Sequence, residues 1–273
     1  MPELPEVETI RRTLAEHVTN LKIERIKLFW PSAVYGWEEK NFVDLVTGRR
    51  ILNLERRGKY LLILLDEDLT IIAHMRMTGR LNYYSHPTEP EKHTHVVFQL
   101  EHGEVHFSDT RKFGRIQVIP TPLRFVESSL AKLGPEPLAE VFTPAVLKER
   151  LGKRKVALKA VLLDQTVLAG LGNIYVDEAL FRAGLSPERR AETLNDEEIS
   201  RLHQAIQSVL QAGIEAQGTS FRDYRDANGE KGSFQQFLQV YGRGGEPCRT
   251  CGQILERKRI AGRTTVYCTR CQC

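Results

Sequence analysis

The sequence lacks any run of about eighteen apolar residues, so no segment is predicted to cross a membrane. Its first residues, MPELPEVETIRR, lack the basic start and apolar core of a secretory signal, which favours a cytoplasmic protein. Hydrophobic residues make up 41% and charged residues 27% of 273 residues, which excludes wholesale disorder. A chain of this length and composition is predicted to form two domains or one large one.

Cysteine is absent until residue 248, and all five cysteines follow from there. Four of them form two Cys-x-x-Cys pairs separated by sixteen residues: Cys248 with Cys251, and Cys268 with Cys271. Because clustered cytoplasmic cysteines bind metal more often than they form disulfides, this spacing predicts one tetrahedral zinc. All four ligand positions are filled by protein, so the zinc is predicted to be structural. Cys273 is left over and is given no role.

Basic residues outnumber acidic residues only near the C-terminal end of the chain. The formal net charge is +4, yet the segment 240–273 holds seven Lys or Arg against two Glu, so the remainder sums to −1. Four thiolates and one zinc would lower this tail to about +3. A basic tail on a neutral body indicates a polyanionic partner. A solvated basic face that improves solubility is the alternative from charge alone.

The apolar pattern changes twice along the chain. Residues 3–17 predict a helix with Pro5 in its first turn, and short apolar runs between about 21 and 120 predict the strands of a β-sandwich. The polar, glycine-rich stretch 218–233 predicts a mobile loop. The remaining predictions are helices at 144–151, 156–163, 174–183 and 196–217, the last with a loose capping box from Asn195 and Glu198, and strands at 254–260 and 264–267 with a turn at 261–262.

The predicted fold class is therefore α+β with several domains. The predicted division is an N-terminal helix and β-sandwich domain at 1–125, a linker at 126–140, a helical domain at 141–235, and a zinc finger at 236–273.

Four separated motifs carry a family resemblance. They are PELPEVET at the start, DTRKFG at 109–114, GLGNIYVDEALFRAG at 170–184, and the C-terminal Cys-x-x-Cys hairpin containing AGR. Together, in this order, they resemble the bacterial formamidopyrimidine-DNA glycosylases of the Fpg/endonuclease VIII family, over essentially the whole chain. The endonuclease VIII branch typically starts PEGPE, so Leu4 favours the Fpg branch. The resemblance implies a helix–two-turn–helix element in the helical domain, a zinc-ribbon-like finger, double-stranded DNA as partner, and a monomer.

Pro2 is the implied nucleophile. Met1 is readily removed before a small residue, and this leaves a secondary amine whose attack on a sugar C1′ gives an iminium cation, an electron sink for elimination. The positive end of a helix favours the uncharged amine. Without the resemblance, Pro2 and Pro5 would merely start a helix.

The resemblance implies further catalytic residues. Glu3 would protonate the ring oxygen of the deoxyribose, a role that needs a carboxyl group holding a proton. Lys59 would bind phosphate and donate the proton in β-elimination, whereas on residues alone it is a solvated edge charge. Arg263, beside the finger turn, would serve δ-elimination and clamp phosphates. Glu6 is a candidate contact to the extruded base, and Glu8 is kept as a partner of the helix dipole.

An extruded base leaves a gap that apolar or planar side chains must fill. Met77, Arg111 and Phe113 match the family positions for this, with Arg111 facing the cytosine of the orphaned pair. Taken singly, Met77 and Phe113 would be core residues.

Four more residues match phosphate-contact positions of the family: His93, Arg154, Asn173 and Tyr241. Asn173 follows two glycines at a helix start, where backbone N–H groups form an anion site. Other Fpg-like sequences often carry Glu at the position of Thr78, so a base contact there is expected to be lost or altered.

The predicted function is a bifunctional DNA glycosylase and abasic-site lyase for 8-oxoguanine opposite cytosine and for formamidopyrimidines. Three alternatives stay open: an endonuclease VIII-like enzyme for oxidised pyrimidines, a catalytically silent zinc-finger DNA-binding protein, and an amino-terminal-proline tautomerase. Tautomerases are much shorter and need no finger. A retained Met1 would leave only the silent binding protein.

Overall fold

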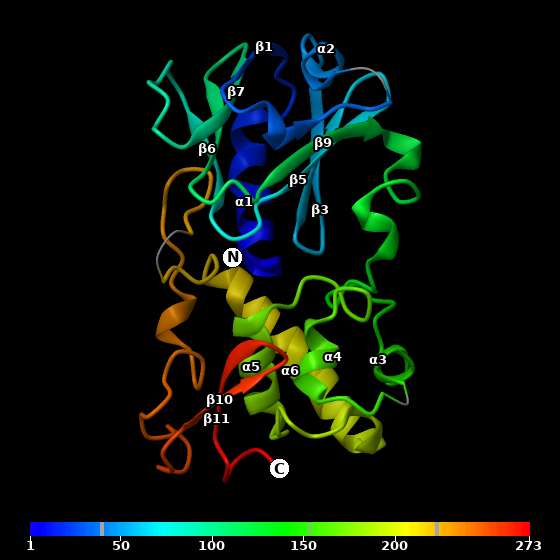
Figure 1. Cartoon of the computed structure of the whole chain (residues 1–273), viewed down its shortest axis with the longest axis vertical. Coiled ribbons are helices and arrows are strands. Elements are labelled where there is room, and N and C mark those ends of the chain that lie inside the picture. Colours follow the sequence, from blue (N-terminus) through cyan, green and yellow to red (C-terminus); the bar gives the residue numbers. More distant parts are fainter. Residues whose placement is uncertain (39–40, 153, 222–223) are drawn as a thin grey trace. The chain divides into compact units, whose positions relative to one another are not determined.

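The computed structural model describes residues 1–38, 41–152, 154–221 and 224–273 (Figure 1). The chain forms two compact units. Unit 1 comprises Met1–Ala131 and Ala216–Ser233, and unit 2 comprises Lys132–Glu215 and Phe234–Cys273. No helix within the described ranges combines the length and the apolarity that crossing a membrane requires.

Unit 1 contains the predicted β-sandwich, which is confirmed as two sheets. Helix α1 covers Leu4–Val18. The four-stranded sheet has the order β1 (Ile23–Leu28), β7 (Thr94–Leu100), β8 (Glu104–Asp109), β6 (Gly79–Tyr84). The five-stranded sheet has the order β2 (Val34–Tyr35), β9 (Arg115–Pro120), β5 (Leu69–His74), β4 (Tyr60–Leu65), β3 (Ile51–Arg57). Neighbouring strands are antiparallel except β2 and β9. The shorter elements of this unit are α2 (Phe42–Val46) and the 3-10 turns Pro31–Ala33 and Thr121–Leu123, and a third 3-10 turn, Ser129–Lys132, spans the boundary to unit 2.

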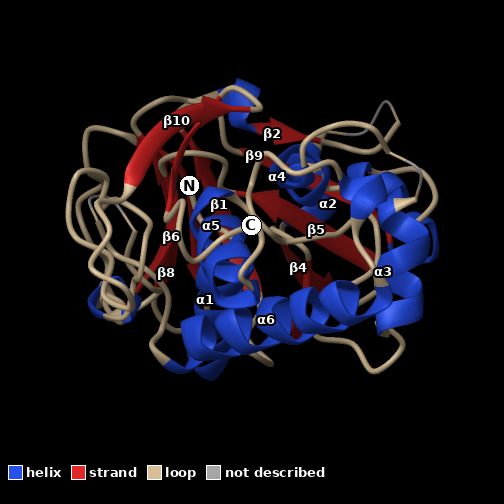
Figure 2. Ribbon diagram, turned by 90° about the horizontal axis from the view of Figure 1, so that it is seen from below, coloured by secondary structure: helices blue, strands red, loops and turns tan. Residues whose placement is uncertain are grey.

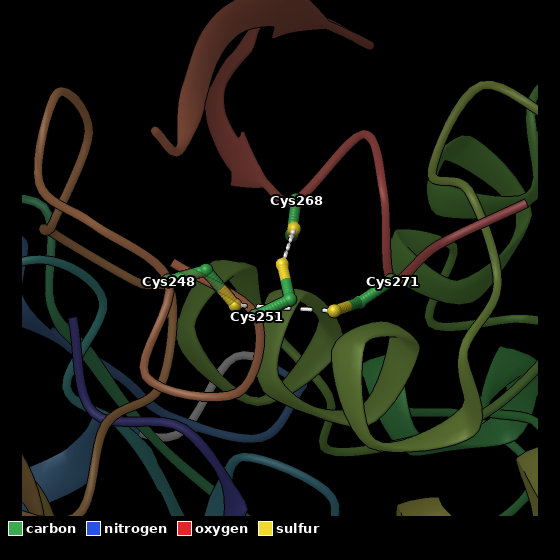
Figure 3. A group of neighbouring side chains, drawn as sticks. All are labelled: Cys248, Cys251, Cys268 and Cys271. Carbon is green, nitrogen blue, oxygen red and sulfur yellow. Dashed lines mark hydrogen bonds between the residues drawn. The ribbon is translucent and has the colours of Figure 1, made fainter. Parts of the chain in front are cut away.

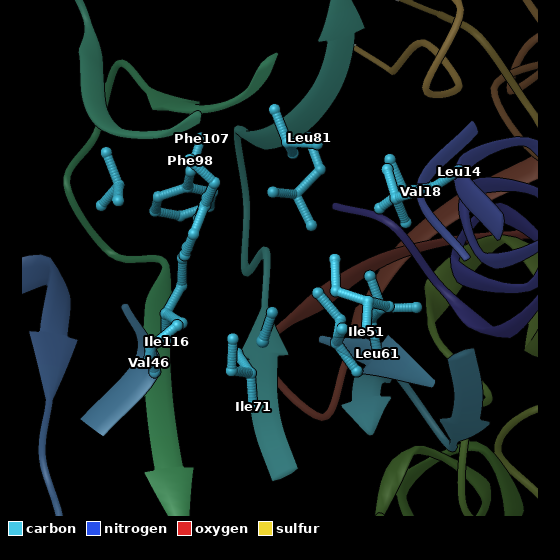
Figure 4. Packing of buried hydrophobic residues seen from close by; sticks show 14 of the residues in the cluster. Leu14, Val18, Val46, Ile51, Leu61, Ile71, Leu81, Phe98, Phe107 and Ile116 are labelled. Carbon is cyan, nitrogen blue, oxygen red and sulfur yellow. The ribbon is translucent and has the colours of Figure 1, made fainter. Parts of the chain in front are cut away.

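The core of unit 1 lies between the two sheets and under α1. Figure 4 shows side chains of both sheets facing one another, Leu61 and Ile71 from one and Phe98 and Phe107 from the other. Helix α1 covers the sandwich core with its apolar stripe, which is buried. The stripe is formed by Val7, Ile10, Leu14 and Val18, each no more than 1% exposed. Each such side chain contributes roughly 1.5–3 kcal/mol by leaving water, so the sandwich supports α1 firmly.

The segment 216–233 belongs to unit 1, although the sequence division places it in the helical domain. Its described residues form no helix or strand, and residues 222 and 223, which fall within the predicted mobile loop, lie outside the described residues. Ala227 is fully buried in the sandwich core, its N–H donates to the Thr13 hydroxyl (3.2 Å), and its carbonyl accepts from the Tyr83 N–H (2.8 Å). These links join residues far apart in the chain, so a division made from local composition does not contain them.

Unit 2 consists of four helices and a two-stranded hairpin in its described part. They are α3 (Pro144–Leu151), α4 (Leu158–Leu163), α5 (Asn173–Ala183), α6 (Asp196–Glu215), β10 (Glu256–Ile260) and β11 (Arg263–Tyr267), with 3-10 turns at Ala191–Thr193 and Phe234–Gln236. Helix α5 packs against α6 (Figure 2). The predicted capping box of α6 is confirmed: the Asn195 side chain accepts from the Glu198 N–H, and the Glu198 carboxylate accepts from the Asn195 N–H, both at 2.9 Å.

Two helix boundaries differ from the prediction by two residues, and those of α1 and the start of α5 differ by one. Helix α4 starts at Leu158, not Val156, because Ala157 is extended and forms a bridge with Arg190. Helix α6 ends at Glu215, two residues early, since the backbone turns left-handed soon afterwards.

Candidate active site and zinc site

The N-terminal residues of unit 1 enter α1 through a buried capping box. Glu3 is 3% exposed, and its N–H donates to the Glu6 carboxylate at 2.9 Å. Pro2 is also buried, and Met1 precedes it in the structure. The Pro2 nitrogen is therefore an amide here, and the predicted role of Pro2 as nucleophile requires that Met1 is removed.

Glu6 links α1 to the segment 216–233. Its Oε1 accepts from the Thr219 N–H at 2.7 Å, while Oε2 accepts from Glu3. The adjacent Gly218 has φ of +84°, and a Cβ there would lie 2.9 Å from the Glu6 Cγ. Glu6 thus has a described role in holding this segment, and its predicted contact to an extruded base stays a prediction.

Glu8 is a charge partner of three arginines. Arg11 and Arg12 contact its carboxylate at 2.8 Å, and Arg56 of β3 contacts it at 3.3 Å. Burial alone would raise the pKa of Glu8, but the hydrogen bonds from Arg11 and Arg12 lower it overall. This carboxylate is structural, and it fixes α1 to the five-stranded sheet.

Lys59 lies in the two-residue turn between β3 and β4, whose ends pair as Arg57 with Tyr60. Lys59 directly precedes β4 and is 6% exposed, so a solvated edge charge is excluded. His74, at the end of β5, was not predicted. Burial first, and then the charges of Arg76 and Lys59, lower the pKa of His74 to about 3. Its Nδ1 accepts from the Arg76 N–H at 2.9 Å, so neutral His74 carries its proton on Nε2.

The gap-filling candidates lie on two turns of unit 1. Met77 is 37% exposed in the turn between β5 and β6, and Phe113 is 48% exposed in the turn between β8 and β9. Core packing is therefore excluded for both. The Arg111 guanidinium lies 4.8 Å from the centre of the Phe113 ring, so these two side chains form a cation–π pair.

Asp109 holds the second turn and was not predicted from the sequence. Its carboxylate accepts from the N–H groups of Arg111 (3.1 Å), Phe113 (2.8 Å) and Gly114 (2.7 Å). The Thr78 hydroxyl donates to the same carboxylate and accepts from the Arg111 N–H (3.3 Å). Thr78 therefore joins the two turns. An aspartate opening a turn is a known signal for such bonds and could have been read from DTRKFG.

His93 lies at the same end of the sandwich. Its carbonyl accepts from the Asp109 N–H at 3.0 Å, immediately before β7. The structure therefore brings together three segments predicted separately, around Met77, His93 and Arg111.

Two phosphate-contact candidates of unit 2 have protein partners. Asn173 is the first residue of α5, and its side-chain amide donates to the Thr264 carbonyl at 2.9 Å. The predicted contact of Asn173 with a phosphate stays a prediction. Arg154 is exposed, and its guanidinium lies 3.7 Å from the Asp164 carboxylate.

Tyr241 is positioned by a residue that the sequence did not reveal. The Glu178 carboxylate of α5 accepts from the N–H groups of Gln239 (2.9 Å), Val240 (2.9 Å) and Tyr241 (2.8 Å). Burial raises the pKa of Glu178, and these three donors oppose the rise. Because each of these hydrogen bonds joins residues more than 60 positions apart, no local sequence pattern indicates them.

Arg263 is exposed at the first position of β11. The predicted turn at Ala261 and Gly262 is confirmed, with φ of +50° and +72°. A turn with both central residues left-handed matches the strand twist and is short and stiff. It presents Arg263 from a defined place on the hairpin.

The four cysteines of unit 2 converge (Figure 3). Their sulfur atoms lie within 4.8 Å of one another, with 3.9 Å between Cys248 and Cys271 and 3.4 Å between Cys251 and Cys268. Sulfurs bound about 2.3 Å from one tetrahedral zinc would be roughly 3.8 Å apart, so the arrangement fits that ion. Burial opposes ionisation of Cys248, yet backbone N–H groups lower the pKa of its thiol to about 7.

The chain matches three family models in succession. They are the formamidopyrimidine-DNA glycosylase N-terminal domain over residues 1–116, the H2TH domain of the same enzymes over 133–225, and the zinc finger found in FPG and IleRS over 245–272. A formamidopyrimidine-DNA glycosylase of Desulfitobacterium hafniense (strain DSM 10664 / DCB-2) is 61% identical over 272 residues, covering 100% of both chains. The chain belongs to the formamidopyrimidine-DNA glycosylase family.

Two solved structures of this family match almost the whole chain. A Lactococcus lactis Fpg variant in complex with Fapy-dG containing DNA gives a TM-score of 0.93 at 38% identity and covers 99% of each chain. A complex of Lactococcus lactis Fpg with DNA containing an abasic site gives the same values.

Family membership confirms the resemblance, the fold class and the enzyme class that the sequence predicted. The finger match and the four converging thiols likewise confirm the prediction of a site for one structural zinc.

Proposed function

We propose that this glycosylase removes oxidised purines from double-stranded DNA, 8-oxoguanine opposite cytosine and formamidopyrimidines, and then cleaves the abasic strand. The observation that carries the proposal is the buried Pro2–Glu3 start of α1 in a chain that is 61% identical to a formamidopyrimidine-DNA glycosylase along its full length. Lactococcus lactis Fpg is solved with Fapy-dG and with abasic-site DNA, which supports both steps.

The chemistry starts once Met1 is removed. The Pro2 amine attacks C1′ of the damaged nucleotide, the bond to the base breaks, and Glu3 protonates the ring oxygen so that the sugar opens to an iminium. Transfer of a C2′ proton to water then expels the 3′ phosphate, and transfer of the C4′ proton to water in a second elimination expels the 5′ phosphate. Lys59 donates a proton to the departing 3′ phosphate in β-elimination, and Arg263 holds phosphate during δ-elimination. Water releases the sugar fragment and restores the amine.

The protein holds DNA through phosphate contacts and recognises the base opposite the extruded nucleotide. His93, Arg154, Asn173 and Tyr241 bind phosphates, which fixes the register of the protein on the duplex. Met77, Arg111 and Phe113 enter the gap, and the Arg111 guanidinium reads cytosine. Glu6 contacts the extruded base.

The enzyme acts as a cytoplasmic monomer, with a helix and β-sandwich domain, a helical domain and a zinc finger as its functional modules. The zinc ion, when bound by Cys248, Cys251, Cys268 and Cys271, supplies a rigid hairpin and no chemistry.

One assay separates this proposal from its rivals. Duplexes carrying one 8-oxoguanine opposite cytosine, or one oxidised pyrimidine opposite guanine, are incubated with the protein and resolved on a denaturing gel. The proposal predicts faster cleavage of the 8-oxoguanine duplex, ending in phosphates on both sides of a one-nucleoside gap. Preference for the pyrimidine would support the endonuclease VIII-like enzyme, and binding without cleavage would support the silent DNA-binding protein.

A further inference from the structure

Unit 2 contains a fully buried ion pair that the proposed chemistry does not use. Lys159 of α4 and Asp177 of α5 meet at 2.5 Å between Nζ and Oδ1, with side chains 0% and 1% exposed. Burial raises the pKa of Asp177 to about 7, against the effect of Lys159, so its charged form is held at some cost. Such pairs can often be replaced by packed apolar residues without loss of stability. Stability alone therefore does not explain the pair.

Both members of the pair reach the backbone of β11. The Lys159 Nζ donates to the Thr264 carbonyl at 3.4 Å, and the Asp177 Oδ2 accepts from the Val266 N–H at 3.3 Å. Asn173 donates to the same Thr264 carbonyl at 2.9 Å. These groups occupy the edge of β11 while its other edge pairs with β10, so the strand is fixed along its length.

Arg263 immediately precedes Thr264 and is exposed. A long exposed side chain is aimed mainly by where its own backbone is held, and the bonds at Thr264 and Val266 hold that backbone. Zinc binds at the other end of β11, after Tyr267, so the metal and the ion pair restrain different parts of the strand.

We propose that Lys159 and Asp177 are positioning residues for Arg263, setting the place of β11 on α5 so that the guanidinium meets phosphate during δ-elimination. This inference rests on the proposed function, because it takes over the role given there to Arg263. Pro2, Glu3 and Lys59 belong to unit 1, whereas the pair belongs to unit 2. Its loss should therefore affect the second elimination and spare base excision.

The test is a double variant, Lys159→Met with Asp177→Leu, which removes both charges and keeps the site filled. Abasic-site DNA is the substrate, and the ratio of δ- to β-elimination product is measured together with the base-excision rate on 8-oxoguanine DNA and with zinc content. A misplacement near 1 Å can lower a rate by about a hundredfold, so we expect the product ratio to fall by roughly tenfold or more. Base excision and zinc content should stay within about twofold of wild type, because apolar residues of similar volume often replace such a pair without loss of stability.

Two further variants make each outcome decisive. Arg189→Met removes another ion pair of unit 2, which joins Arg189 to Glu198 of α6 at 2.5 Å, and should leave the ratio unchanged. Arg263→Ala should lower the ratio. If it does and the double variant does not, the positioning role is wrong. If Arg263→Ala itself leaves the ratio unchanged, the role proposed for Arg263 is wrong. Loss of zinc from the double variant would also overturn the inference, because the pair would then hold the finger as a whole.

Discussion

The sandwich of unit 1 and the finger of unit 2 both present DNA-contact candidates from short turns, but different forces hold those turns. The sandwich has a large apolar core between two sheets under α1. The apolar cluster of the finger is small, with Val240, Leu255, Val266 and two of the cysteines buried and Phe181 packed against them. A core that small does not support a fold alone, so the finger depends on its metal and on α5.

The holding groups at the turns differ in the same way. In unit 1 one carboxylate, Asp109, gathers three backbone N–H groups beneath Arg111 and Phe113. In unit 2 four thiolates and a buried ion pair act on β11 from two ends. Loss of the holding group should therefore loosen a single turn in unit 1, whereas it should unfold the whole finger in unit 2.

Removing the zinc should have the largest effect and should separate the finger from the sandwich most clearly. Structural zinc contributes roughly 10–16 kcal/mol of binding free energy to small fingers, far more than the apolar contacts of this one. Chelation, or Cys251→Ser, should unfold the finger and abolish DNA binding, while the cooperative unfolding of unit 1 is retained. Metal analysis should give about one zinc per chain.

Cys273→Ser is the matched control, because Cys273 is exposed and lies outside the four-thiol group. It should change neither zinc content nor affinity. Full DNA affinity in metal-free protein would contradict the dependence of the finger on zinc.

Asp109→Ala tests the turn of unit 1. Three N–H groups would lose their acceptor, each worth about 0.5–1.5 kcal/mol, and the Arg111–Phe113 turn should loosen. We expect weaker binding to DNA with an emptied site and little loss of zinc. Thermal unfolding, zinc analysis and titration with abasic-site DNA measure the three effects. A variant that bound such DNA as wild type does would show that the carboxylate is not needed there.

Arg111→Ala and Arg263→Ala should separate base reading from phosphate binding. Loss of Arg111 should remove about 1–3 kcal/mol of preference for cytosine opposite the lesion while most affinity for an abasic duplex remains. Loss of Arg263 should weaken binding to every sequence and reduce the salt slope by roughly one. Titrations at several salt concentrations, with cytosine or adenine opposite the lesion, measure both. Wild-type cytosine preference in Arg111→Ala would refute its reading role.

Ala261→Gly should have the smallest effect. Ala261 has φ of +50°, a conformation that costs a residue with a Cβ about 1–2 kcal/mol, and glycine relieves part of that strain. The finger should gain a few tenths to about 1 kcal/mol, without any change in unit 1. Zinc release on heating measures the gain, and a less stable finger would mean that the turn is not strained.

Sequence reasoning succeeded where a property is local or carried by spacing. The stripe of α1, the capping box of α6, the hairpin turn and the four cysteines are patterns within a few residues or at fixed intervals, and the structure contains each of them. It did not reach the bonds from Glu6 to Thr219, from Glu178 to Tyr241 or from Asp177 to Val266, because each joins segments 60 or more residues apart. Roles such as that of Pro2 came from family resemblance, since proline at a helix start is common.

The most direct test of the account is borohydride trapping on a duplex with one 8-oxoguanine opposite cytosine. Protein whose intact mass shows that Met1 has been removed should become covalently attached to the DNA, through reduction of the iminium at Pro2. Protein that retains Met1, or whose amino terminus is chemically blocked, should not be trapped. Pro2→Gly is a weaker control, because its terminal primary amine can substitute. Equal trapping of blocked and unblocked protein would contradict the claim that the Pro2 amine is the nucleophile.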